Sequence, residues 1–256
     1  MLDIIKSFIA AISTYSKIPM PNVNGEEKSF RFTIAFFPFV GVIIYGLLYL
    51  WMFITNKFEF DRVVFLLGIM IIIVMTTGGI HVDGLMDVFD AKCSYGDTKK
   101  KLEILKDPHI GAFSVIKLLE YVGVFFAGLL LIKEEYMPAL FLMVIFSRIL
   151  SGLSVCLFNG AKESGMIAYI KRTASKGCVP FLCIQFLIAL VTCILFFGIR
   201  MLIPVFASAI YFGYYKYRTN KDFGGITGDT SGYFLCMTEL IWILVFAVLS
   251  VVSKWI

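Results

Sequence analysis

Long apolar runs separated by short polar connections dominate the chain. A helix needs roughly 20 apolar residues to cross about 30 Å of hydrocarbon. Runs close to that length predict about seven transmembrane helices, at residues 33–55, 63–77, 113–132, 136–158, 179–199, 201–215 and 233–252. The second and sixth runs are short, so six spans, with one of these runs re-entrant or merged, remain an alternative. We therefore expect an all-α integral membrane protein whose residues 1–256 form a single polytopic domain.

The Lys and Arg residues between the runs predict which side each connection faces, because positive residues are retained in the cytoplasm. In the seven-span reading, 16 of them share the side of the N-terminus and 5 lie on the other side. The N-terminus is therefore predicted to be cytoplasmic, and the loops at residues 78–112 and 216–232 are predicted to project from the cytoplasmic (inner) membrane on the same side. Residues 1–31 begin with apolar residues at helical spacing and are expected to form an interfacial segment.

Composition agrees with this reading. The chain is 59% apolar and 16% charged, with a mean hydropathy of +0.88, well outside the range of ordinary soluble domains. Its net charge of +5 follows from the same bias in the loops and favours contact with anionic lipid headgroups. Membrane lipid is thus an expected partner, and nucleic acid is not.

The first predicted cytoplasmic loop carries an acidic motif directly after Gly78-Gly79. If the residues that follow are helical, a turn of about 100° per residue places Asp83, Asp87 and Asp90 on one face. Carboxylates so close repel one another, and no basic residue is interleaved among them. A solvated acidic face is the simpler explanation of such a trio, but its place at the end of a predicted span favours a bound cation. Oxygen ligands without cysteine favour Mg²⁺, which usually takes one or two carboxylates together with substrate phosphates.

The last predicted connection echoes this motif. Both contain Gly-Gly-Ile, two further residues and then an aspartate, so Gly78 to Asp83 and Gly224 to Asp229 have the same spacing. Glycines let backbone amides approach an anion closely, and a neighbouring carboxylate can hold the counter-cation. A loop of this kind suits a phosphate ester, although glycine turns between membrane helices are ordinary. The segment reads Gly224-Gly225-Ile226-Thr227-Gly228-Asp229-Thr230-Ser231-Gly232.

Polar residues before the third predicted span add further candidates. Lys106, Asp107 and His109 offer a cation, a carboxylate and an imidazole, and His81 is the other histidine of the chain. Each histidine is a candidate base or substrate contact, although a loop histidine is more often simply solvated.

Two charged residues fall inside predicted spans. Arg148 lies in the fourth and Glu239 in the seventh, where a charge costs about 2.5–3.5 kcal/mol on insertion scales. Such residues face protein or a polar cavity. A structural Arg148–Glu239 ion pair and anion binding by Arg148 both remain open.

These motifs together resemble the cobalamin synthase family, also called adenosylcobinamide-GDP ribazoletransferase, and the resemblance extends over nearly the whole chain. Three segments carry it with the N-terminal Tyr15-Ser16-Lys17-Ile18-Pro19-Met20-Pro21: residues 77–90, 105–113 and 224–239. The family's His-x-Asp-Gly-Leu-x-Asp-x-x-Asp pattern is met in full by residues 81–90. Its Lys-Asp-Ser-x-Ile-Gly pattern is met at residues 106–111, except that Pro108 replaces the usual Ser, so the chain lacks a hydroxyl there.

The resemblance implies a Mg²⁺-dependent phosphoryl transfer. A hydroxyl of α-ribazole, or of its 5'-phosphate, attacks the cobinamide-linked phosphorus of adenosylcobinamide-GDP, and GMP leaves. We expect catalytic roles for His81, Asp83, Lys106, Asp107, His109 and Arg148, and metal ligation by Asp83, Asp87, Asp90 and Asp229. Substrate contacts are expected from Gly78, Gly79, Gly84, Gly111, Gly224, Gly225, Thr227, Gly228, Thr230 and Glu239.

Two rival functions follow from the same residues. A CDP-alcohol phosphotransferase making phospholipid also uses spaced aspartates at a membrane face, but its pattern has Ala-Arg after the second aspartate pair, where this chain has Ala91-Lys92. An ion-coupled transporter would relay ions through Asp and His residues, but here the acids concentrate in loops on one side. The oligomeric state stays open, with a homo-oligomer as one option.

Overall fold

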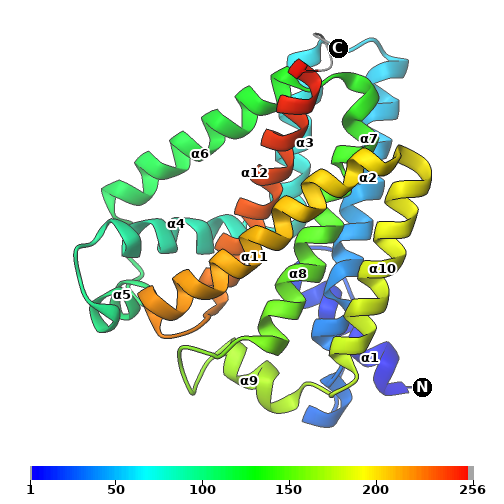
Figure 1. Cartoon of the computed structure of the whole chain (residues 1–256). Coiled ribbons are helices and arrows are strands. Elements are labelled where there is room, and N and C mark those ends of the chain that lie inside the picture. The colour runs from blue at the N-terminus through cyan, green and yellow to red at the C-terminus, as the bar shows by residue number, and fades with distance from the viewer. Residues whose placement is uncertain (1, 253–256) are drawn as a thin grey trace.

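Helices account for nearly all regular structure of the protein (Figure 1). The structure, a computed structural model, describes residues 2–252. Within them, the one strand-like pairing is an isolated bridge between Gly160 and Ile226, so the predicted all-α class is confirmed. In chain order the elements are α1 (Leu2–Tyr15), η1 (Glu27–Phe30), η2 (Thr33–Phe36), α2 (Phe37–Lys57), α3 (Arg62–Thr77), α4 (Ile80–Cys93), α5 (Thr98–Ile104), α6 (Ala112–Leu131), η3 (Glu134–Tyr136), α7 (Met137–Leu140), α8 (Met143–Leu157), α9 (Met166–Thr173), α10 (Cys178–Phe197), η4 (Ile199–Met201), α11 (Leu202–Phe223) and α12 (Gly228–Val252).

The number of helices that could cross a membrane is five to six in the described residues. The predicted count of seven is therefore not confirmed. Every predicted run lies in helix, but α3 has only 16 residues and meets α4 at 94°, and α11 ends in the polar residues 216–223. Joined as one bent span, α3 and α4 would be the sixth. The five stretches that are long and apolar enough are Glu27–Lys57, Ala112–Leu131, Glu134–Leu157, Cys178–Phe197 and Gly228–Val252.

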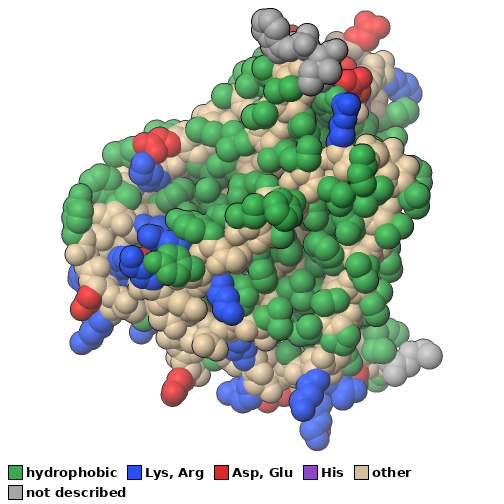
Figure 2. Space-filling view, viewed as in Figure 1, with side chains coloured by type: hydrophobic (Ala, Val, Ile, Leu, Met, Phe, Trp, Pro, Cys, Tyr) green, Lys and Arg blue, Asp and Glu red, His purple; other side chains and the backbone are tan. Residues whose placement is uncertain are grey.

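The outer surface of the bundle is apolar over its middle. Green hydrophobic side chains cover much of the visible face in Figure 2, whereas most of the visible Lys and Arg lie at its lower end and along its left side. Helix α10 contributes Leu187 and Leu195, which are 58% and 76% exposed. A soluble protein rarely leaves such a surface uncovered, so these side chains are suited to lipid.

Helix α12 is the centre of the bundle. It packs against α4, α6, α8 and α11 and buries a row of large side chains along its length (Figure 1). Trp242 is fully buried, stacks on Phe146 with ring centroids 5.1 Å apart, and donates its indole N–H to Ser208 Oγ at 2.8 Å. A helix that is buried on most sides can position residues from its neighbours, and its N-terminal turn reaches the polar end of the molecule.

Glycines allow α4 to lie directly on the first turns of α12. Gly78 and Gly79 adopt positive φ angles of 65° and 78°, which ends α3 and turns the chain into α4. A Cβ at Gly84 would lie 2.8 Å from the carbonyl oxygen of Asp229, and a Cβ at Gly232 would lie 3.1 Å from that of His81. The backbones of α4 and α12 therefore touch with no side chain between them.

The turn between α11 and α12 is held by local hydrogen bonds. Thr227 Oγ1 accepts from the N–H of Thr230 at 3.1 Å, and Thr230 Oγ1 accepts from the N–H of Thr227 at 2.8 Å. This reciprocal pair satisfies backbone donors at the start of α12. Ile226 also exchanges two backbone hydrogen bonds with the loop after α8, at Asn159 and Ala161. The turn is thus fixed both within itself and to its neighbour.

Candidate active site

The three aspartates of α4 share one helix face, as the sequence predicts. Helix α4 lies across the direction of α3, which leaves this face open: Asp83 is exposed, and Asp87 and Asp90 are half-buried. Partial burial, followed by the carboxylates of Asp83, Asp229 and Asp90, raises the pKa of Asp87 to about 6. The four predicted metal ligands therefore form one electrostatic cluster, although Asp229 comes from the other end of the chain.

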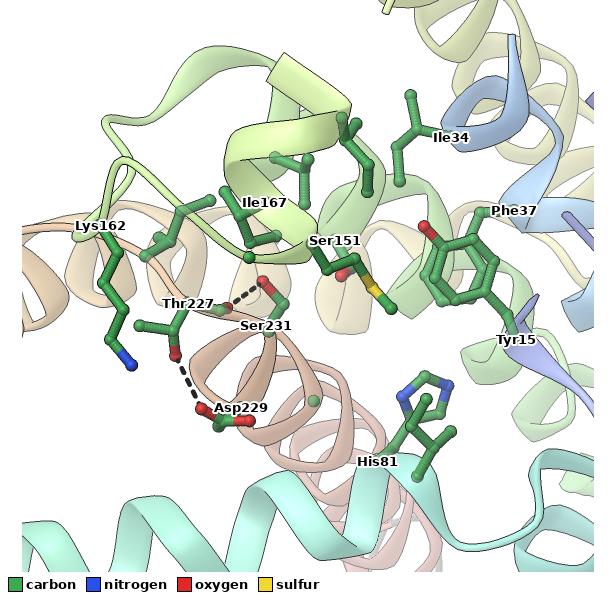
Figure 3. Close-up of a pocket in the computed structure, with 18 of the residues that line it drawn as sticks. Tyr15, Ile34, Phe37, His81, Ser151, Lys162, Ile167, Thr227, Asp229 and Ser231 are labelled. Atoms are coloured by element: carbon green, nitrogen blue, oxygen red, sulfur yellow. Dashed lines mark hydrogen bonds between the residues drawn. The ribbon is translucent and has the colours of Figure 1, made fainter. Parts of the chain in front are cut away.

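Asp229 reaches the cluster from the first turn of α12. Its Oδ2 accepts a hydrogen bond from Thr227 Oγ1 at 3.3 Å, and Lys162, from the loop after α8, lies close enough to interact with it electrostatically (Figure 3). The positive end of the α12 dipole also favours negative charge here. Anionic and cationic groups thus alternate at this point, which suits a bound phosphate and its counter-cation.

A cavity of about 300 Å³ opens beside Asp83 and Asp229. Its walls come from α1, α2, α4, α8, α9 and α12. One end is polar, with Lys162, Thr227 and Ser231 near the two aspartates, and the other end is apolar (Figure 3). The apolar residues of the wall are Tyr15, Ile34, Phe37, Val155, Ile167 and Ile170. The imidazole of His81 also lines the cavity beside Tyr15 and Phe37, with its ring centroid 5.8 Å from that of Phe37 (Figure 3).

Asp83 also lines a second, small cleft. It is lined by the three α4 aspartates together with His109 and Gly111, so the predicted loop does reach the acidic face. Gly111 is needed for this approach, because a Cβ there would lie 2.1 Å from Oδ1 of Asp90. Asp83 lines both the cleft and the larger cavity.

His109 and Asp107 form an exposed pair at the entrance to this cleft. His109 Nδ1 lies 2.7 Å from Asp107 Oδ1, and the backbone N–H of His109 donates to the same oxygen at 3.0 Å. These two bonds lower the pKa of Asp107. Lys106 is exposed and lines neither the cleft nor the cavity.

Arg148 and Glu239 form the buried ion pair that the sequence left as one of two readings. Arg148 Nη1 lies 2.7 Å from Glu239 Oε1, and Ser147 Oγ donates to the same oxygen at 3.1 Å. Neither charged residue lines the 300 Å³ cavity; Glu239 instead lines a separate apolar cavity of about 180 Å³, which His81 also lines. The Nε and Nη2 atoms of Arg148 and Nε2 of His81 are buried with no hydrogen-bond partner among residues 2–252. Substrate contact by this pair stays a prediction.

The remaining predicted substrate-binding residues fall into two groups. Thr227 and Gly228 line the main cavity. The others shape the backbone: the left-handed glycines end α3 and α11, Gly84 admits α12, and the buried Thr230 hydroxyl is engaged by Thr227 and by Tyr215. The backbone group comprises Gly78, Gly79, Gly84, Gly224, Gly225 and Thr230.

Comparison with known proteins assigns the chain to a family. The family model described as cobalamin-5-phosphate synthase matches residues 7–247, which is most of the chain. The chain belongs to this family. The resemblance expected from the motifs is thereby confirmed.

Relatives of the cobalamin-5-phosphate synthase family match over almost their whole length. A protein from Lachnoclostridium phytofermentans named adenosylcobinamide-GDP ribazoletransferase is 36% identical over 239 residues, covering 92% of this chain and 91% of the relative. Proteins of the same name from Clostridium perfringens and Fusobacterium nucleatum are 32% and 29% identical, covering 95% of this chain and 98% of each relative. No solved structure matches the chain.

The sequence did not predict several residues that line the cavity of this synthase-family chain. Lys162 had been counted only as one positive loop residue, and Tyr15 belonged to the N-terminal pattern without a role. Ile34, Phe37 and Ser151 lie in apolar runs, where pattern alone does not separate a cavity wall from core or lipid contact, and Ile167 lies in the connection between the fourth and fifth runs. The N-terminal family pattern was the one available signal, because it includes Tyr15.

The donor set of the site fits Mg²⁺ through shared coordination. Within residues 2–252, no three or more His, Cys, Asp or Glu side chains are placed so that they could hold a metal ion together. Mg²⁺ does not need such a set, since it usually keeps water and substrate phosphate oxygens beside one or two carboxylates. Partial burial first, and then the neighbouring carboxylates, raise the pKa of Asp87, and a cation would relieve both effects.

Proposed function

We propose that this chain transfers the cobinamide phosphate of adenosylcobinamide-GDP to α-ribazole or α-ribazole 5'-phosphate. The products are adenosylcobalamin, or its 5'-phosphate, and GMP, and the reaction is the last assembly step of the nucleotide loop in cobalamin biosynthesis. The observation that carries the proposal is the acidic row of α4 meeting Asp229 beside a half-apolar cavity, in a chain whose relatives bear this transferase's name.

The chemistry is a displacement at phosphorus. A ribazole hydroxyl oxygen forms a bond to the cobinamide-linked phosphorus, the bond between that phosphorus and the oxygen of GMP breaks, and the hydroxyl proton is lost. Such transfer asks a protein mainly to align the groups and to stabilise charge on the phosphoryl oxygens. It needs no covalent nucleophile, and the site is built mostly of carboxylates and cations.

Asp83, Asp87, Asp90 and Asp229 would hold Mg²⁺ together with the substrate diphosphate. The ion would supply positive charge to the phosphoryl oxygens and the leaving GMP. Lys162 and the Thr227 hydroxyl, on the cavity side of Asp229, are placed to contact the same oxygens. His81, at the cavity wall, and His109, at the cleft, are the two candidate proton acceptors.

The site belongs at the cytoplasmic face of the cytoplasmic membrane. Most of the visible Lys and Arg lie at the lower end and the left side of the molecule in Figure 2, which agrees with retention of positive loops in the cytoplasm. Cys93, at the end of α4, offers a test. We expect a membrane-impermeant thiol reagent to label it in inside-out vesicles and not in intact cells; labelling from outside intact cells would reverse the orientation.

Turnover by purified protein tests the reaction itself. Detergent-solubilised protein given adenosylcobinamide-GDP, α-ribazole and Mg²⁺ should release GMP and form adenosylcobalamin, with little turnover in EDTA. A phospholipid synthase would instead consume a CDP-activated lipid and release CMP, and a transporter would leave every nucleotide intact. Intact adenosylcobinamide-GDP in the complete mixture would refute the proposal.

A further inference from the structure

The apolar half of the main cavity takes no part in the chemistry described above. Tyr15 and Phe37 lie side by side at this end, with ring centroids 4.3 Å apart, and Ile167 of α9 lines the same cavity above Thr227 and Ser231 (Figure 3). The charged residues of the cavity gather at the opposite end, around Asp229. A largely apolar pocket with a few polar groups at one end is the usual form of a small-molecule site.

The polarity of this pocket indicates which part of the two substrates can bind in it. Its walls offer the hydroxyls of Tyr15 and Ser151 and the imidazole of His81, but no side-chain carboxylate, amide or cation among the apolar residues. Guanine carries N–H donors and a carbonyl acceptor, which would lose hydrogen bonds to water without replacement there. The base of α-ribazole is a dimethylbenzimidazole with two methyl groups and no N–H donor, so burial in this pocket leaves no donor unsatisfied.

Size points the same way. The whole cavity is about 300 Å³, at the lower end of the range of roughly 300–1,000 Å³ for small-molecule sites. A nucleoside fits such a volume, whereas the corrin ring of cobinamide with its side chains does not.

The two openings beside Asp83 fit the direction of the reaction. The attacking and leaving oxygens lie roughly in line on opposite sides of phosphorus. Asp83 lines both the half-apolar cavity and the cleft with His109 and Gly111. An acceptor that enters from the cavity and a leaving group at the cleft would therefore meet at Asp83.

We propose that the apolar half of the cavity is the acceptor subsite, which holds the aromatic base of α-ribazole against Tyr15 and Phe37, in the cavity that Ile167 also lines, and directs its ribose toward Asp83 and Asp229. This inference rests on the proposed function and adds the position of one substrate. It makes Ile167, which is far from the carboxylates in the chain, a determinant of acceptor specificity.

The experiment compares two acceptors in Ile167→Phe, which fills the pocket. The acceptors are α-ribazole and the same riboside with unmethylated benzimidazole. We expect the ratio of kcat/KM for methylated over unmethylated acceptor to fall at least about tenfold, since one methylene in an apolar pocket changes selectivity by about 10–200-fold. The KM for adenosylcobinamide-GDP should stay within about twofold. The ratio does not depend on the fraction of correctly folded enzyme.

Two further variants complete the test. Leu187→Phe makes the same kind of change on the exposed face of α10 and should leave the ratio unchanged. Ile167→Ala, which enlarges the pocket, should raise the KM for α-ribazole about tenfold. An unchanged ratio in Ile167→Phe, or a rise confined to the KM for adenosylcobinamide-GDP, would overturn the subsite. If the wild type released no GMP, the proposed function would be wrong, and direct binding of radiolabelled α-ribazole to wild type and Ile167→Phe would decide the subsite alone.

Discussion

The two Gly-Gly-Ile segments place an aspartate at the site by different means. Between α3 and α4, two successive left-handed glycines make the turn, and no side chain caps α4. Its support is tertiary: Lys17 N–H donates to the carbonyl of Thr76 at 2.8 Å, and Gly84 rests on the backbone of Asp229. The turn between α11 and α12 also has two glycines, but here the Thr227–Thr230 pair caps the start of α12 with local hydrogen bonds. Equal spacing in sequence therefore hides one turn that depends on packing and one that depends on local hydrogen bonds.

The largest expected effect is a loss of turnover that is similar for the aspartates of the two segments. Asp83→Asn and Asp229→Asn should each lower turnover at least about a hundredfold, because a neutral amide is a poor ligand for a hard cation. Asp87→Asn and Asp90→Asn should behave in the same way.

Steady-state GMP release measures this effect, with the exposed Glu135→Gln as a matched carboxylate control. Near-normal turnover in either Asp83→Asn or Asp229→Asn would show that the two turns do not serve one metal site.

The next effect tests the contact between α4 and α12, on which the first turn depends. Gly84→Ala should push α4 away from α12, since the added Cβ would lie within 3 Å of Asp229 backbone atoms that have little room to move. We expect at least a tenfold loss of turnover and a lower melting temperature in detergent. Gly123→Ala in α6 is the control, because nothing lies within 4 Å of its Cβ. Wild-type behaviour of Gly84→Ala would contradict the close contact of the two backbones.

A smaller effect tests local capping. Thr227→Ala removes the acceptor for the N–H of Thr230 and should destabilise the protein by about 1 kcal/mol, the usual effect of losing a helix N-cap. Thr227→Ser keeps the hydroxyl and should restore most of that stability. Thermal unfolding of the two variants side by side provides the measurement. Equal stability of the Ala and Ser variants would show that the Thr227 hydroxyl does not stabilise the start of α12.

The smallest effect concerns pH. The pKa of Asp87 in the metal-free fold, about 6, lies above its ordinary value, so the fold favours the protonated form. Its contribution to stability is therefore present at low pH and is lost as pH rises through about 6. In EDTA, the melting temperature should fall slightly between pH 5 and pH 7, and Asp87→Asn should abolish this dependence. A rise over the same interval that also disappears in Asp87→Asn would show that the neighbouring carboxylates do not act on this group.

The sequence predicts the helices and the acidic face because both follow from periodicity. The apolar runs all fall in helices, and Asp83, Asp87 and Asp90 share a face because α4 is regular. The number of spans was less certain for a physical reason: α11 continues as a helix through polar residues, and α3 is too short to cross alone.

The walls of the cavity could not be predicted in the same way. Tyr15, Phe37 and Ile167 come from three separate elements, and their meeting depends on how α1, α2 and α9 pack, which no local pattern encodes. Arg148 and Glu239 illustrate the intermediate case. Their burial was foreseeable from their place in apolar runs, and the ion pair was one of two readings, but the choice between them required the 2.7 Å contact.

The contact of Gly84 with the start of α12 has a consequence for biosynthesis. Helix α4 is synthesised early, and the backbone on which it rests is made more than 140 residues later, as the difference between positions 84 and 229 shows. During translation the aspartates of α4 are therefore present at the membrane before Asp229 has been synthesised. The loop at Asn159 likewise lacks its backbone hydrogen bond with Ile226 until that residue has been synthesised. The nascent chain thus has no assembled site until its last helix emerges from the ribosome, and a chain released before that point would carry the aspartates of α4 without the capacity to use them.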